Sequence, residues 1–144
     1  FSRRCEQWYS APSIQLLPGE RLRIALAIAA PEDLGSIASE NIKKLLEKLA
    51  EKEAERIELI PTAEIATFEA IAQLLEKQPH IFHFIGHGRL QDDDGREVGQ
   101  VALVDDIFDE ALWLDADSFS ELFSRWQPKV VVLPGCEGGG LATS

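Results

Sequence analysis

The sequence is short of positive charge. Its 144 residues carry 14 Lys and Arg against 25 Asp and Glu, which gives a net charge of −11 at pH 7. The deficit is local, because residues 91–121 hold one basic and 11 acidic side chains. No basic patch is available to neutralise phosphates, so we expect neither nucleic acid nor an anionic membrane among the direct partners.

Cysteines and long apolar runs are also scarce. The two cysteines, Cys5 and Cys136, lie far apart and do not form the framework of a small secreted domain. No apolar run approaches the roughly 18 residues that span a bilayer, and no signal-peptide pattern is present. We therefore expect a cytoplasmic, reducing location. Since the first residue is Phe, we also expect a fragment or processed product of a longer protein.

Short apolar runs alternate with amphipathic segments along most of the chain. We expect strands at 22–29, 56–60, 80–85 and 129–133, and helices at 36–54, 67–77 and 115–126. Thr67 and Asp115 are the expected helix caps. Two apolar pieces within the acidic, turn-rich stretch 89–114, at 101–104 and 112–114, predict a hairpin or meander.

The predicted strand 22–29 is a nearly continuous apolar run, as is typical of a strand buried on both faces. The predicted fold is therefore α/β, a parallel sheet sandwiched by helices. Residues 1–21 show no clear period, and we interpret them as an irregular leader or the end of a preceding module. Residues 22–144 form the predicted domain.

Two glycine-flanked residues follow neighbouring strands of this sheet. His87 lies in Gly86-His87-Gly88, and Cys136 lies in the glycine-rich segment 135–140. The carboxyl ends of parallel strands meet at one edge, where a thiol and an imidazole form the minimal set for a cysteine nucleophile. Either residue alone is more often structural. Together, with glycines that let backbone N–H groups approach a substrate, they favour catalysis.

The segments around these two residues resemble a known family. The segments ATFEAIAQLLEKQPHIFHFIGHGRL, GQVALVD, LDADSFSELF and PKVVVLPGCEGG are similar to a CHAT domain, a caspase-like branch of the cysteine peptidases. The spacing of 49 positions between His87 and Cys136 agrees with the caspase arrangement. The resemblance implies a caspase-hemoglobinase fold, with Cys136 as nucleophile and His87 as its catalytic partner. It also implies an oxyanion hole made by the backbone N–H groups of Gly88 and Cys136.

The same resemblance sets expectations for the function. It implies a bacterial cysteine endopeptidase that acts on proteins or peptides, needs no cofactor or metal, and is switched by a regulatory module such as a TPR-type helical repeat. The family continues beyond the cysteine, so we expect the C-terminal part of the fold to be missing from this chain. One alternative is a catalytically silent scaffold that binds partners through the same cleft, because Pro134-Gly135 replaces the family's small residue pair. A flavodoxin-like small-molecule or nucleotide site is a third reading, although the glycine-rich segment lacks the Lys-Ser/Thr of a Walker loop.

The acidic stretch bears on specificity. An acidic rim beside a cleft raises the local concentration of basic peptides, so we expect a preference for Lys or Arg near the cut. Glu32 and Asp33, at the exit of the first strand, are the candidate carboxylates of the substrate pocket. The caspase pattern Q-A-C-R-G is absent, so caspase specificity for Asp is not expected.

Other candidate site residues have simpler interpretations. In an extended strand His83 lies roughly 13 Å from His87, too far to share a zinc ion. We expect His83 to pack within the sheet and His80 to be a surface residue at a strand entry. Asp92-Asp93-Asp94-Gly95 imitates a calcium loop, but the register puts Leu90 and Val101 where EF-hand carboxylates are required.

Overall fold

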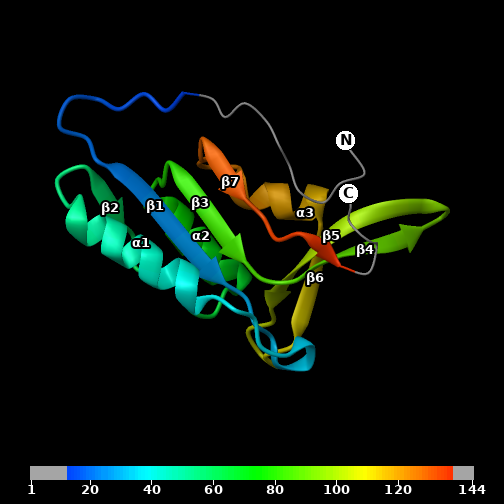
Figure 1. The fold of residues 1–144 in the computed structure, drawn as a ribbon. Helices are drawn as coiled ribbons and strands as arrows, with labels where there is room; N and C mark the ends of the chain where they lie inside the picture. Colours follow the sequence, from blue (N-terminus) through cyan, green and yellow to red (C-terminus); the bar gives the residue numbers. More distant parts are fainter. Residues whose placement is uncertain (1–12, 138–144) are drawn as a thin grey trace.

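The core of the molecule is a four-stranded parallel sheet. The computed structural model describes residues 13–137 (Figure 1). Within them the sheet has the order β2-β1-β3-β7 and consists of β1 (Leu22–Ile28), β2 (Ile57–Leu59), β3 (Ile81–Ile85) and β7 (Val130–Val132). All three strand pairs are parallel. The predicted α/β fold with a parallel sheet between helices is confirmed.

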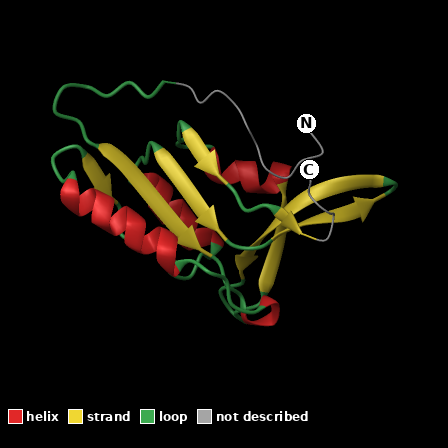
Figure 2. Cartoon of the chain, in the orientation of Figure 1, coloured by secondary structure: helices red, strands yellow, loops and turns green. Residues whose placement is uncertain are grey.

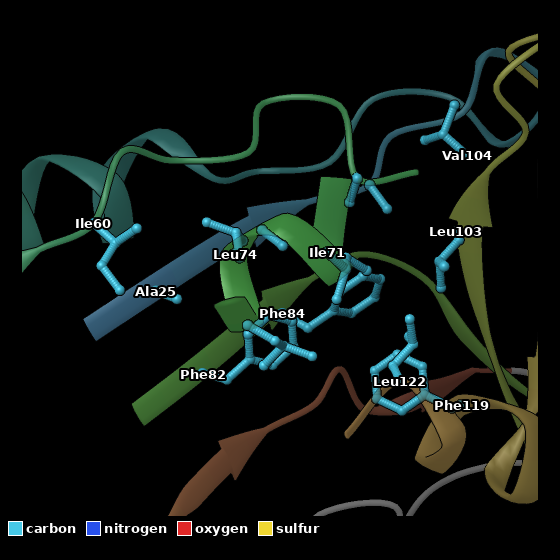
Figure 3. Packing of buried hydrophobic residues seen from close by; sticks show 14 residues of the cluster. Ala25, Ile60, Ile71, Leu74, Phe82, Phe84, Leu103, Val104, Phe119 and Leu122 are labelled. Atoms are coloured by element: carbon cyan, nitrogen blue, oxygen red, sulfur yellow. The ribbon is translucent and has the colours of Figure 1, made fainter. Parts of the chain in front are cut away.

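Helices cover the sheet on both faces (Figures 1 and 2). One face packs against α1 (Glu40–Lys52), and the other against α2 (Phe68–Glu76), α3 (Ala116–Ser120) and the short 3₁₀ helix η2 (Glu121–Phe123). Alternate residues of β1 therefore enter different clusters. Leu26 packs on the α1 side, whereas Ala25 packs on the α2 side, where Figure 3 shows it with Phe82 and Phe84 of β3. This two-sided burial explains the continuous apolar run of β1.

The two expected helix caps are present. The Thr67 hydroxyl accepts a hydrogen bond from the Ala70 N–H at 3.0 Å, and the Asp115 carboxylate accepts one from the Ser118 N–H at 2.9 Å. The bond to Ser118 lowers the pKa of Asp115. The helix that Asp115 starts is shorter than predicted, because α3 ends at Ser120 and continues as η2. Beyond it, the Trp126 indole N–H donates to the Pro79 carbonyl at 2.6 Å.

A second sheet extends from the carboxyl edge of the first. It has the order β6-β5-β4-β8, made of β4 (Gly88–Asp93), β5 (Arg96–Val104), β6 (Ala111–Asp115) and β8 (Cys136–Glu137). Strands β4, β5 and β6 form an antiparallel meander. The apolar pieces 101–104 and 112–114 lie on β5 and β6 and pair as expected, whereas β4 was not predicted. Asp94 and Gly95 have φ values of 52° and 80°, so the apparent calcium loop is a tight hairpin turn with two left-handed residues. Figure 1 shows this hairpin projecting from the body of the domain.

The N-terminal part of the described chain has no regular structure. Residues 13–21 contain no helix or strand. Residues 1–12, and Cys5 with them, lie outside the described residues, so the interpretation of 1–21 as a leader stays a prediction.

His80 is not the surface residue that the sequence suggested. The residue is 5% exposed, and its Nδ1 accepts a hydrogen bond from the Arg23 N–H at 2.9 Å. The His80 carbonyl also accepts from the Lys129 N–H at 2.8 Å, so the residue joins the starts of β1 and β7. The prediction was wrong because the burial comes from two strands that are distant in sequence. His83 lies within β3, where it is partly buried and burial lowers its pKa.

The stability of the domain is expected to fall in mild acid because of His80. Burial lowers the pKa of His80, the positive charges of Arg23 and Lys129 lower it further, and Glu20 opposes them. A histidine whose pKa is lowered in the folded state contributes its full stability above its ordinary pKa, about 6.5, and loses it as the pH falls through the lowered value.

We therefore expect the free energy of unfolding to decrease below about pH 6.5. The slope should be shallower in His80→Asn, whose amide oxygen accepts the Arg23 hydrogen bond without titrating. His83 supplies a parallel contribution in both proteins. Denaturant unfolding at several pH values measures the slopes. Identical slopes for the wild type and His80→Asn would contradict the assignment.

Candidate active site

The predicted catalytic histidine lies where the chain passes from the first sheet to the second. Gly86 and His87 connect β3 to β4, and the His87 carbonyl accepts a hydrogen bond from the Ala102 N–H of β5 at 3.0 Å. A Cβ on Gly86 would lie 2.8 Å from the Phe84 ring and 3.3 Å from the Ala29 Cβ. Glycine therefore lets the chain pass close to the end of β1. This close passage holds His87 at the carboxyl edge of the parallel sheet.

The backbone of Cys136 lies beside this loop. Strand β8 pairs in parallel with β4, and Cys136 is the register partner of Gly88. Neighbouring strands are about 4.8 Å apart, so the residue that follows His87 is adjacent to the backbone of the predicted nucleophile. The side chains of Cys136 and Glu137 lie outside the described part of the structure, and so does the predicted thiol–imidazole contact.

Glycine at position 88 is required by this pairing. A Cβ built on Gly88 would lie 2.7 Å from the carbonyl oxygen of Gly135, a separation that real Cβ atoms essentially never show. The obstacle is backbone and cannot rotate away. The His87 and Cys136 segments therefore meet backbone to backbone, at a distance that only glycine permits.

The His87 imidazole has an unusual environment. The side chain is partly buried, and its Nε2 atom is buried without a hydrogen-bond partner among the described residues. Buried polar atoms nearly always have a partner, and an exception calls for an explanation such as a catalytic role. The side chain of Cys136, which is the predicted partner of this imidazole, lies outside the described part of the structure.

Arg89 is a residue of this region that the sequence reasoning missed. Its Nε donates to the Gln100 side-chain oxygen at 2.8 Å, and its guanidinium lies 4.0 Å from the centre of the Trp113 ring. Trp113 is the register partner of Ala102, whose N–H binds the His87 carbonyl. Arg89, two residues after His87, thus connects β4 to β5 and β6. The signal in the sequence was its position two residues after His87, but its partners depend on the register of the meander.

The two candidate pocket carboxylates belong to the 3₁₀ turn η1 (Glu32–Leu34) after β1. One oxygen of Asp33 accepts a hydrogen bond from the Ala111 N–H at 2.9 Å, and the Glu32 N–H donates to the Asp109 carbonyl at 2.9 Å. Both residues therefore fasten the β5–β6 loop to the end of β1. The Glu32 side chain is exposed, and the role of either carboxylate in a substrate pocket stays a prediction.

Neither a metal-binding cluster nor a membrane-spanning helix is present among the described residues. Among residues 13–137, no three His, Cys, Asp or Glu side chains that the structure describes are grouped so as to hold a metal ion. Over the same described residues, no helix has the length and apolar character needed to cross a membrane.

The fold and the two strand-end loops define a caspase-like α/β domain. The family model of the CHAT domain matches residues 8–143, nearly the whole chain. The chain therefore belongs to the CHAT domain family, which is caspase-like and related to the cysteine peptidases. A comparison with curated proteins gave no match. All the predicted site residues lie within the matched range, and their individual roles stay predictions.

Proposed function

We propose that this CHAT domain is a cysteine endopeptidase in which Cys136 is the nucleophile and His87 the general acid and base. The observation that supports this most strongly is the backbone contact between the two loops. Gly88 and Cys136 are register partners, and the approach of Gly88 to the Gly135 carbonyl leaves no room for a Cβ. A contact this close holds the segments of the proposed dyad in a fixed relation, as catalysis requires.

In the proposed reaction, the Cys136 thiolate attacks the carbonyl carbon of the scissile peptide bond. His87 takes the thiol proton and passes it to the leaving amine, which departs and leaves a thioester on Cys136. Water then attacks the thioester with His87 as base, which releases the acid product and restores the thiol. No cofactor takes part in these steps.

The N–H groups of Gly88 and Cys136 are proposed to stabilise the oxyanion of each tetrahedral intermediate. Because Ala102 donates to the His87 carbonyl, Gly88 and Val101 form a non-hydrogen-bonded pair of the antiparallel ladder. The Gly88 N–H therefore points away from β5, to the side on which β8 lies.

We further propose a preference for substrates with Lys or Arg near the cut. The β4–β5 hairpin, which begins directly after His87, carries four exposed carboxylates, those of Asp92, Asp93, Asp94 and Glu97. A local negative field attracts basic peptides and repels acidic ones.

The domain is proposed to act in a bacterial cytoplasm under the control of a partner or an adjacent module such as a TPR-type repeat.

Labelling of the intact protein with a peptide that carries a thiol-reactive ketone tests the mechanism. We expect the label on Cys136 and not on Cys5, because His87 is the proposed activating imidazole of Cys136, whereas the first histidine after Cys5 in the sequence is His80. His87→Gln should slow the labelling about 100-fold, since general acid–base groups contribute 10²–10⁴-fold. A probe with Lys should react faster than the same probe with Asp.

His83→Gln is the matched control for this experiment, because His83 lies on β3 only four residues before His87. It should react at close to the wild-type rate. Equal labelling of both cysteines, or a His87→Gln rate equal to the wild type, would favour the alternative of a silent scaffold. A faster reaction with the Asp probe would contradict the proposed specificity alone.

A further inference from the structure

The β5–β6 loop, residues 105–110, presents two adjacent large apolar side chains to solvent. Ile107 is 75% exposed and Phe108 is 70% exposed. The strands that flank the loop in sequence, β5 and β6, both contribute side chains to the core. Isolated exposed apolar residues are common on protein surfaces, whereas contiguous exposed apolar groups more often mark an interaction site. The exposure of this adjacent pair therefore indicates an interaction site.

The loop backbone is held in place at several points. One Asp105 oxygen accepts hydrogen bonds from the N–H groups of Ile107 and Phe108, at 2.8 and 3.0 Å. These bonds lower the pKa of Asp105, so its carboxylate stays ionised. The hydrogen bond from the Glu32 N–H to the Asp109 carbonyl, and the one from the Ala111 N–H to the Asp33 carboxylate, fix the C-terminal end of the loop to η1. A loop held in this way loses little conformational entropy when a partner binds.

The surroundings of the apolar pair are negatively charged. Glu32, Asp106, Asp109 and Glu110 are exposed, and none of them forms an ion pair within residues 13–137. The sequence from 97 to 124 contains no Lys or Arg. An apolar centre with a charged rim is the usual composition of a protein interface, and complementary charge on the rim selects the partner.

We propose that loop 105–110 is a docking site for a separate protein whose surface has an apolar pocket rimmed by Lys and Arg. Ile107 and Phe108 enter the pocket, and the carboxylates around them face the basic rim. This inference goes beyond the proposed peptidase activity and does not depend on it, because it uses neither Cys136 nor His87.

Photo-crosslinking tests the proposal in the intact protein. The probe is benzoylphenylalanine placed at position 108 in the cells that produce the protein. We expect one predominant adduct with another protein, joined at an apolar site flanked by Lys or Arg. The double charge reversal Asp106→Lys/Glu110→Lys should reduce the adduct at least tenfold, while Cys136→Ala should leave it unchanged.

Two controls separate docking from general stickiness. Benzoylphenylalanine at Leu45, which is 62% exposed on α1, should not give the same adduct. The reversal Asp92→Lys/Asp93→Lys, at the equally acidic hairpin, should leave the adduct at position 108 within about twofold. With the captured protein purified, Phe108→Ala should weaken binding about tenfold, as loss of an interface anchor typically does.

Several results would overturn the proposal. These are no adduct above that at Leu45, an adduct within the same chain or with a second copy, and an adduct that survives the charge reversal at 106 and 110. Because the readout is binding, it can fail while Cys136 still reacts with the peptide probe, and it can succeed when Cys136 does not react.

Discussion

Replacement of Gly88 by Ala should lower kcat/KM for peptide cleavage about 100-fold or more. The added Cβ would lie 2.7 Å from the Gly135 carbonyl oxygen, so β4 and β8 must separate. Cys136 directly follows Gly135 and moves with it. A displacement of about 1 Å at a catalytic group can cost on the order of 100-fold in rate. The measurement is steady-state cleavage of a peptide by the intact protein.

Gly99→Ala is the matched control for this variant. Gly99 lies in the same sheet, on β5, and a Cβ there would meet nothing within 4 Å. We expect its kcat/KM within about twofold of the wild type and a thermal stability close to that of the wild type, because one added methyl group on an open strand changes little. If Gly88→Ala cleaved as fast as Gly99→Ala, the close contact between the loops would have no part in catalysis.

The parallel sheet could be predicted from local sequence because its signals are local. From position 24 to position 28 β1 is apolar throughout, because both of its faces are covered there. Thr67 and Asp115 cap their helices by accepting hydrogen bonds from N–H groups only three residues later. The burial of His80 was missed for the opposite reason. It depends on Arg23 of β1 and on Lys129, which directly precedes β7, and both are remote from His80 in the sequence.

The candidate site was predictable only in part. Parallel strand order implies that the ends of β3 and β7 lie at one edge, which is why His87 and Cys136 could be paired without knowledge of their contacts. Gly88 was expected as a source of an oxyanion N–H, but its close approach to Gly135 became visible only when β8 was placed beside β4.

The interactions of charged residues around the site were harder to predict. Arg89 contacts Trp113, which is 24 positions away, because two turns of the meander set the register of β4, β5 and β6. Asp33 lies at the exit of β1 as expected, yet its hydrogen bond goes to Ala111, 78 positions later. No local pattern encodes these pairs, since each depends on how separate elements pack.

Replacement of Cys136 by Ala should remove peptide cleavage altogether, with a loss of roughly 10⁴-fold or more. The thiolate forms the covalent bond to the substrate, and loss of a nucleophile commonly leaves only the residual rate from binding and oxyanion stabilisation. Cys5→Ala is the matched control, because it removes the other cysteine of the chain and should retain the wild-type rate.

The most direct test is therefore the cleavage rate of a Lys- or Arg-containing peptide library by the intact wild type, Cys136→Ala and Cys5→Ala, measured side by side. The account predicts cleavage by the wild type and Cys5→Ala and none above background by Cys136→Ala. Cleavage by Cys136→Ala at the wild-type rate would contradict the assignment of the nucleophile, and with it the proposed mechanism.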